Sequence, residues 1–495
     1  MKRQVQSVAA IRAAVDQGLM SPAAVLAAAE VRHRETHPRL NALVQERFEA
    51  AAIEARDGVG SVAGRLAGVP VSVKECFAVA GLRTTLGIEA RRGASDAADA
   101  DLVDRVRAAG AVVVGKANVP QAMLLHETVN PVWGRTTHPL DPSRGPGGSS
   151  GGDAALVAAG VVPLGLGNDL AGSLRQPAHA CGIATIMPRS TALGTGGAID
   201  TLPHLTAVRP RAGFLARTVA DLRLALGAVG VPAAAHPERR LTIGWWDDAG
   251  PIPASPAIRR AVRAAVERLA AANATVRPLD GGLARDAAWL MMAIVSADGG
   301  ADIHRLFAGE RPIPGVARLL RLARVPRGVR PLAAAVARLC GRGIEAEALA
   351  RTGPRDADAF AALLAAREAL RGRITAELAG IDAIVCPVSA LPALRHGTAA
   401  RLVLAAAPCL LANLLELPAG AVPVTSVRPD EERGRGFSFD PVLRAAAATD
   451  RGSRGLPVGV QVVGGLDADE AIVLDVMAAI EARGDVRPVA AVSDR

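Results

Sequence analysis

Short apolar runs that alternate with helical patterns constrain the fold of this chain more than any other feature. From Gly68 onward, residues 69–73 and 111–114 have the composition of buried strands. Between them, residues 101–109 have a helical pattern that Gly110 is expected to end, because glycine readily adopts the left-handed backbone conformation that closes a helix. Strands that alternate with helices form sheets with both faces covered. The pattern therefore predicts an α/β fold.

The remainder of the chain is predicted to add helices and strands to the same domain. Residues 1–60 are predicted to form an N-terminal helical segment packed on the core, and residues 61–488 the main domain. Ser255 and Pro256 are expected to open a helix, residues 381–387 and 456–463 to form buried strands, and residues 467–482 to form a closing helix. The Pro- and Arg-rich residues 428–455 are interpreted as a surface insertion. Since no internal repeat or domain boundary is visible, one large domain is expected.

A Gly- and Ser-rich stretch covers residues 143–198. Such composition usually marks turns and linkers, but here apolar segments at 154–159 and 161–166 interrupt it and belong in a core. A serine beside glycine can expose its hydroxyl while neighbouring backbone N–H groups point into one concavity, which suits an oxyanion. The stretch therefore predicts a nucleophilic serine.

A serine nucleophile needs a neighbour that takes its proton. His126, His138 and His179 lie near the stretch in sequence, but no Asp or Glu partner for them can be identified. Lys74, at the end of a predicted strand, is the better candidate base. Only three of the 57 basic residues are lysine, and arginine cannot replace lysine as a neutral amine base.

Charge and composition argue against a nucleic-acid-binding protein, a disulfide-rich protein and a metal-binding protein. The net charge of +9 and the pI of about 10.3 suggest a nucleic-acid partner, but the basic residues are scattered among acidic ones and aromatic residues are only 2%. No nucleic-acid partner is therefore expected. Five widely spaced cysteines without CxxC pairs indicate neither a disulfide framework nor a metal site.

The same reading bears on the cellular location of the protein. The apolar stretch at the N-terminus is too short and interrupted for a signal peptide. The most apolar window, residues 402–415, is shorter than the roughly 20 residues that a membrane-spanning helix needs. A soluble, cytoplasmic protein without a transmembrane segment is expected.

Lys74 and two serine motifs stand in a characteristic order and spacing. Lys74 precedes Ser149 of the GGSSGG run by 75 residues, and Ser149 precedes Ser173 of the GSLR run by 24 residues. This ordered set resembles the amidase signature family. Matches extend from residues 40–42 to residues 455–461, so the resemblance covers nearly the whole chain. Within the family the chain is most similar to the fatty acid amide hydrolase branch, through PVSVKECF, NVPQAM, PGGSSGGDAAL and PAGAVPVTSV.

The resemblance implies a fold and a mechanism. The fold is a single large domain with a central mixed, twisted β-sheet covered by helices on both faces and a signature core at about residues 68–222. Ser173 would attack the amide carbonyl, and Ser149, on a cis peptide bond, would pass the proton of Ser173 to Lys74. Water would hydrolyse the resulting acyl-enzyme without a cofactor or a metal. Backbone N–H groups would form the oxyanion hole, at Leu170, Ala171, Gly172 and Ser173.

Other positions follow less directly from the resemblance. Met123 and Ser150 are the candidate substrate-binding residues; Met123 stays open between pocket wall and plain core, and Ser150 is expected to form a hydrogen bond beside the relay. Asp169 and Arg175 are expected to brace the nucleophile loop.

Two departures from the family pattern leave the pocket shape and the substrate open. Asn168 and Ala171 replace the usual Thr and first Gly before the nucleophile, and residues 187–192 lack the usual motif after it.

The expected activity is hydrolysis of a small-molecule, lipophilic amide. Alternatives are an acyl transferase or an amidotransferase subunit that uses the same acyl-enzyme, as in the glutamyl-tRNA amidotransferase A subunit, and a catalytically silent binding homologue. The oligomeric state is open, with a homodimer among the options. The lysine and the two serines, intact in a lysine-poor chain, favour the hydrolase.

Overall fold

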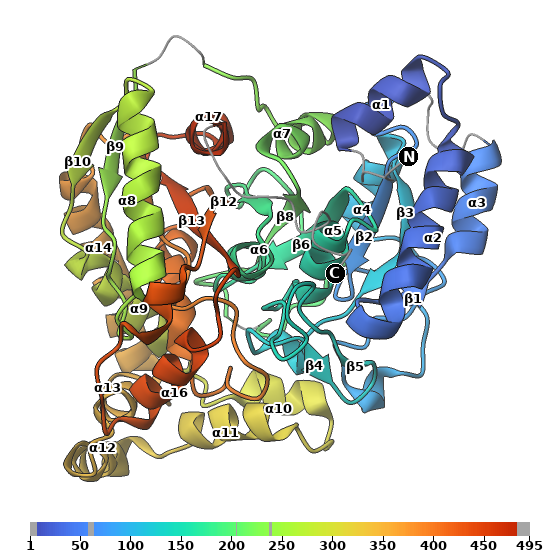
Figure 1. The fold of residues 1–495 in the computed structure, drawn as a ribbon. Helices are drawn as coiled ribbons and strands as arrows, with labels where there is room; N and C mark the ends of the chain where they lie inside the picture. Colours follow the sequence, from blue (N-terminus) through green and yellow to red (C-terminus); the bar gives the residue numbers. More distant parts are fainter. Residues whose placement is uncertain (1–6, 58–63, 204, 237–239, 483–495) are drawn as a thin grey trace.

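One eleven-stranded sheet organises the molecule (Figure 1). The computed structural model describes residues 7–57, 64–203, 205–236 and 240–482. The strand order is β1-β3-β2-β6-β8-β7-β12-β13-β11-β9-β10, and β4 and β5 form a separate two-stranded sheet. The strands are β1 (Leu43–Glu46), β2 (Pro70–Lys74), β3 (Val112–Ala117), β4 (Val129–Asn130), β5 (Gly134–Arg135), β6 (Leu164–Asp169), β7 (Ala184–Met187), β8 (Arg211–Ala216), β9 (Thr242–Trp245), β10 (Thr275–Pro278), β11 (Ala383–Pro387), β12 (Ala419–Ser426) and β13 (Pro457–Gly464).

The sheet is mixed, as the resemblance implies. Strands β3, β2 and β6 run parallel to their neighbours in that group, and so do β11, β9 and β10. The strands between the two groups pair antiparallel, from β6 through β8, β7, β12 and β13 to β11. The predicted strands at residues 69–73, 111–114, 381–387 and 456–463 correspond to β2, β3, β11 and β13, so those predictions are confirmed.

Helices cover both faces of the sheet. On one face α5 and α6 contact each other and the strands, and every residue of both helices is buried. On the other face α17 contacts α7, α8 and β12. The described helices are α1 (Val8–Asp16), α2 (Pro22–Leu40), α3 (Phe48–Asp57), α4 (Asp101–Ala108), α5 (Gly151–Ala159), α6 (Arg175–Cys181), α7 (Val219–Ala228), α8 (Pro256–Ala271), α9 (Gly282–Val295), α10 (Ala301–Phe307), α11 (Pro314–Ala323), α12 (Arg330–Leu339), α13 (Gly343–Arg351), α14 (Ala357–Glu377), α15 (Leu410–Leu414), α16 (Pro441–Asp450) and α17 (Glu470–Glu481).

The N-terminal segment is partly different from its prediction. Residues 43–46 form β1, which pairs antiparallel with β3 at the edge of the sheet, whereas the sequence predicts helices throughout 1–60. A run of four residues is too short for its periodicity to separate a strand from a helix. Helices α1, α2 and α3 account for most of the other described residues of this segment, and Figure 1 shows α2 and α3 beside β1 and β3. Residues 1–6, 58–63, 204, 237–239 and 483–488 of the two predicted segments lie outside the described residues.

The interpretation of residues 428–455 as a surface insertion is wrong at α16, whose Thr449 and Asp450 are buried. Thr449 contacts Arg144, a fully buried side chain near the start of the Gly- and Ser-rich stretch. The Arg144 guanidinium donates to the carbonyl oxygens of Ala393 at 2.7 Å and Thr449 at 2.9 Å, and to the Asp141 carboxylate at 3.0 Å. It therefore ties the two halves of the chain together. Of the helices described, none is long and apolar enough to cross a lipid bilayer.

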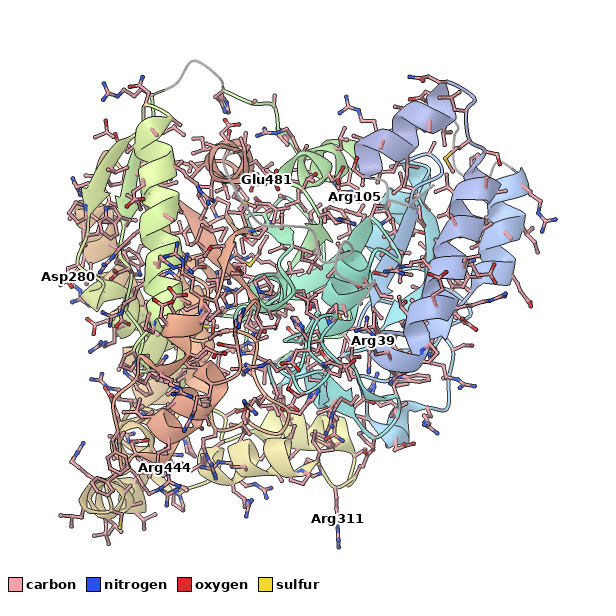
Figure 2. All side chains as sticks on the ribbon, in the orientation of Figure 1. Arg39, Arg105, Asp280, Arg311, Arg444 and Glu481 are labelled. Carbon is pink, nitrogen blue, oxygen red and sulfur yellow. The ribbon has the colours of Figure 1, made fainter. Side chains whose placement is uncertain are left out.

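We expect Arg144→Met to lower the free energy of unfolding by about 3–5 kcal/mol, because it leaves buried carbonyl oxygens and the Asp141 carboxylate without their donor. Urea unfolding followed by tryptophan fluorescence measures the change. The control is Arg444→Met, at an exposed arginine of α16 that is labelled in Figure 2, which should change the free energy by less than about 0.5 kcal/mol. Equal effects of the two substitutions would contradict this account of Arg144.

Candidate active site

The candidate site lies where two neighbouring parallel strands end. Strands β2 and β6 pair in parallel, and Val73 of β2 is opposite Leu166 of β6. Lys74 is the last residue of β2, and Asn168 and Asp169 are the last two residues of β6. The carboxyl ends of parallel strands meet at one edge of a sheet, where α/β proteins place their sites. The three polar side chains are therefore brought together by strand register.

Lys74 is fully buried, and its ammonium nitrogen has three close polar neighbours. Nζ lies 2.7 Å from Ser149 Oγ, 2.6 Å from Asn168 Oδ1 and 3.2 Å from the Asn168 carbonyl oxygen. No carboxylate of the described residues forms an ion pair with Lys74, and the Glu75 carboxylate instead accepts from Thr85 at 2.6 Å. Burial lowers the pKa of Lys74, and more distant charges only partly oppose the shift.

The two serines sit on loops that lead into α5 and α6. A cis peptide bond joins Gly148 to Ser149, as the resemblance implies, and α5 begins at Gly151. Ser173 lies between β6 and α6, and the Ser150 amide donates to its carbonyl oxygen at 3.0 Å. Among the described residues the Ser149 and Ser173 hydroxyls form no hydrogen bond with each other, but both line one cavity. Contacts of this kind commonly tighten when substrate binds.

A buried ion pair holds the loop that carries Ser173. Arg175 donates to both carboxylate oxygens of Asp169 at 3.0 Å, and the Asp169 carboxylate also accepts from the amides of Gly172 at 2.7 Å and Leu174 at 3.0 Å. Although burial raises the pKa of Asp169, Arg175 and these amides outweigh it and hold the pKa well below its usual range. The expectation that Asp169 and Arg175 brace the loop is confirmed.

The backbone of this loop is suited to bind an oxyanion. Among the described residues, none accepts a hydrogen bond from the amides of Leu170, Ala171 or Ser173, whereas the Gly172 amide is bonded to Asp169. Seven described residues other than glycine have positive φ, and Ala171 is not one of them. Its replacement of the family glycine therefore creates no backbone strain. Gly172, at φ +96°, does need to be glycine.

The cavity beside the serines has a volume of about 270 Å³ and is mainly apolar. His126, Asn168 and the two serines, Ser149 and Ser173, are among the polar residues that line it. Met123 lines it, whereas Ser150 and Gly172 do not, and Ser150 Oγ lies 3.4 Å from the Asn168 carbonyl oxygen instead. The apolar walls include Leu170, Ala171, Leu202, Trp289, Met292, Val295, Ile303, Leu320, Leu404 and Leu410.

The sequence does not predict that three polar residues, Asn168, Asn413 and Gln461, belong to the site. The sequence marks Asn168 only as a departure from the family pattern. Asn413 and Gln461 bond to the Arg175 guanidinium at 2.6 Å and 2.9 Å. Each of these two lies alone in an otherwise apolar buried segment, and that isolation is the signal that could reveal a buried polar network.

We expect Gly172→Ala to lower the free energy of unfolding by about 2–5 kcal/mol. A left-handed conformation costs an alanine about 1–2 kcal/mol, and overpacking adds about 1–3 kcal/mol. The new Cβ would lie 3.0 Å from Cβ of Cys409. Gly18→Ala is the matched control, because Gly18 also has a positive φ, of +67°, but a Cβ there meets no atom within 4 Å. Urea unfolding of both variants tests the difference, and equal losses would count against the packing constraint.

Comparisons with known proteins show what this chain is similar to. A family model described as Amidase matches residues 24–473. Fatty-acid amide hydrolase 1 of Sus scrofa is 33% identical over 422 residues, which cover 81% of this chain and 73% of that relative. Fatty acid amide hydrolase 1 of Caenorhabditis elegans is 31% identical over 432 residues, which cover 82% and 75%.

A solved structure shows the same fold. A structure titled fatty acid amide hydrolase superposes with a TM-score of 0.81 at 20% identity, covering 96% of this chain and 84% of that one. The shared fold, the family model and the two relatives lead to the same assignment. This chain belongs to the amidase signature family of amide-hydrolysing enzymes.

Proposed function

We propose that this enzyme hydrolyses the C–N bond of a lipophilic carboxylic acid amide, with Ser173 as nucleophile, Ser149 as proton relay and Lys74 as base. The observation that carries the proposal is the 2.7 Å contact between Lys74 Nζ and Ser149 Oγ, at the end of a cavity that Ser173 also lines. Family membership supports amide cleavage, and the geometry supports these three roles.

The burial of Lys74 supports its role as a base. A lysine accepts a proton only when its amine is neutral, and burial lowers the pKa of Lys74 from its ordinary value. Ser173 Oγ would attack the carbonyl carbon while its proton passes to Ser149 and the proton of Ser149 passes to Lys74. The protonated lysine would return a proton through Ser149 to the leaving nitrogen as the C–N bond breaks. Water would then cleave the ester on Ser173 by the same route and release the acid.

The loop before α6 would stabilise the negative charge that develops on the carbonyl oxygen. The amides of Leu170, Ala171 and Ser173 are available for this, whereas the Gly172 amide is bonded to Asp169. Donors fixed in place before the reaction need no reorganisation, and the loss of one such donor typically costs about 3–4 kcal/mol of transition-state stabilisation. The Asp169–Arg175 pair would keep them in place.

The walls of the cavity support a lipophilic acyl group. They consist largely of Leu, Met, Val, Ile and Trp side chains, and each CH₂ group that leaves water contributes about 0.8 kcal/mol. The volume of about 270 Å³ is near the lower end of the roughly 300–1,000 Å³ of drug-sized ligand sites. An acyl chain or ring of moderate size fits this cavity better than a large polar group.

We expect a fluorophosphonate probe to label Ser173 and no label to form on Ser173→Ala. Lys74→Met and Ser149→Ala should slow labelling by about 10²–10⁴-fold, because the nucleophile loses its base or its relay. Ser143→Ala, at an exposed serine of the same Gly- and Ser-rich stretch, is the control and should label like the parent protein. Mass spectrometry locates the label, and undiminished labelling of Ser173→Ala would refute the proposal.

We expect kcat/KM for a series of anilides to rise with acyl length by up to about 4-fold per CH₂ group, the equivalent of about 0.8 kcal/mol. The rise should stop, and then reverse, once the chain fills the cavity. Release of the free carboxylic acid is the measurement, since it also separates hydrolysis from transfer to another nucleophile. A preference for short polar acyl groups would refute the lipophilic assignment while leaving the three catalytic residues in place.

A further inference from the structure

We propose that Asn168 is a positioning residue that fixes the direction in which the proton moves between Ser149 and Lys74. This inference rests on the function proposed above and extends it to a residue that departs from the family pattern. Asn168 is buried at the end of β6, lines the cavity and supplies two of the three polar neighbours of Lys74 Nζ.

The number of hydrogen-bond donors and acceptors around Lys74 Nζ determines the direction of the hydrogen bond between Lys74 and Ser149. Oδ1 and the backbone oxygen of Asn168 are both carbonyl oxygens, which accept hydrogen bonds and cannot donate them. A neutral amine has two N–H groups and one lone pair, so the two oxygens occupy both N–H groups. Only the lone pair is left for Ser149 Oγ, at 2.7 Å. The Ser149 hydroxyl must then donate to Lys74, which leaves its oxygen free to accept the proton of Ser173.

The same three neighbours also suit the charged lysine. After the proton has moved, three N–H groups face three acceptors, and no donor is left without a partner. Without the Asn168 side chain, the neutral amine would have a spare N–H group that can donate to Ser149 and turn that hydroxyl away from Nζ. The family threonine at this position carries a hydroxyl, which can donate as well as accept, whereas an amide oxygen can only accept.

Four other ionisable side chains lie near Lys74, on the segments that surround it. Burial raises the pKa of Asp153 on α5 to about 7 and that of Cys76 after β2 to about 12, and it lowers the pKa of His126 to about 4. Asp169 on β6 stays charged within its ion pair. All four are unchanged in variants of Asn168, so a comparison between those variants isolates the Asn168 side chain.

The test is the rate constant for fluorophosphonate labelling of Ser173 as a function of pH, over about pH 5–10. Labelling should be lost as pH falls through the pKa of Lys74, because the amine becomes charged. Asn168→Asp places a negative charge beside Nζ and should move this loss to higher pH by about 1–3 units. Asn168→Leu removes the acceptor that stabilises the charged amine. It should move the loss to lower pH, with a plateau about 10–100-fold below that of the parent protein.

Opposite shifts in the two variants would support a positioning role for Asn168. If both variants label more slowly with unchanged pH midpoints, Asn168 acts on structure alone and the inference is wrong. Asn273→Asp, the same substitution in the exposed turn after α8, is the control and should reproduce the parent profile. Thermal unfolding checks each fold. If Asn168→Leu does not fold, a midpoint moved to higher pH in Asn168→Asp supports the inference and an unchanged midpoint contradicts it. Failure of the proposed function is distinguishable, because Lys74→Met would then label like the parent protein.

Discussion

The buried ion pair between Asp169 and Arg175 is the interaction on which the site depends most. Two charges removed from water are stable only if hydrogen bonds occupy their remaining positions, and removal of one partner costs about 3–5 kcal/mol. The Asp169 carboxylate accepts hydrogen bonds from backbone amides of its own loop. The Arg175 guanidinium donates to the Cys409 carbonyl oxygen at 3.0 Å and to the Gln461 side chain at 2.9 Å. The loop that bears Ser173 is therefore bound to the C-terminal half of the sheet, and it cannot shift without exposing a charge to an apolar interior.

Lys74 and Arg175 are both fully buried, yet their surroundings give them opposite properties. Arg175 has a carboxylate partner, and the pKa of its guanidinium is raised above its ordinary value. Lys74 faces a hydroxyl and two carbonyl oxygens, none of which carries a charge, and its pKa is lowered. The permanent charge of Arg175 fixes the geometry of the loop, whereas a lysine whose pKa is lowered is better suited to exchange a proton. At this edge of the sheet, Arg175 therefore has a structural role and Lys74 is suited to acid–base chemistry.

Periodicity predicts the elements that are long or that alternate clearly, and it fails where the run is short. Strands β2 and β3 are predicted within three residues at each end, whereas β1 is missed because its four residues pair with a strand about 70 positions away. The three catalytic candidates stand in recognisable motifs. The partners of Arg175 do not, since Asn413 and Gln461 follow it by 238 and 286 residues. No local pattern encodes which distant amide will meet a buried guanidinium.

The scarcity of lysine narrows the search for a base, but it does not identify one by itself. Lys116 is also fully buried at the end of a parallel strand, and burial lowers its pKa as well. It differs from Lys74 in its neighbours, because its ammonium group lies 3.1 Å from the Asp96 carboxylate and donates to the Arg83 carbonyl oxygen at 2.7 Å. An adjacent carboxylate favours the charged form of Lys116 and opposes the effect of burial on its pKa. What marks Lys74 as a candidate base is the combination of burial, uncharged acceptors and a serine hydroxyl within reach, and only the folded chain brings these together.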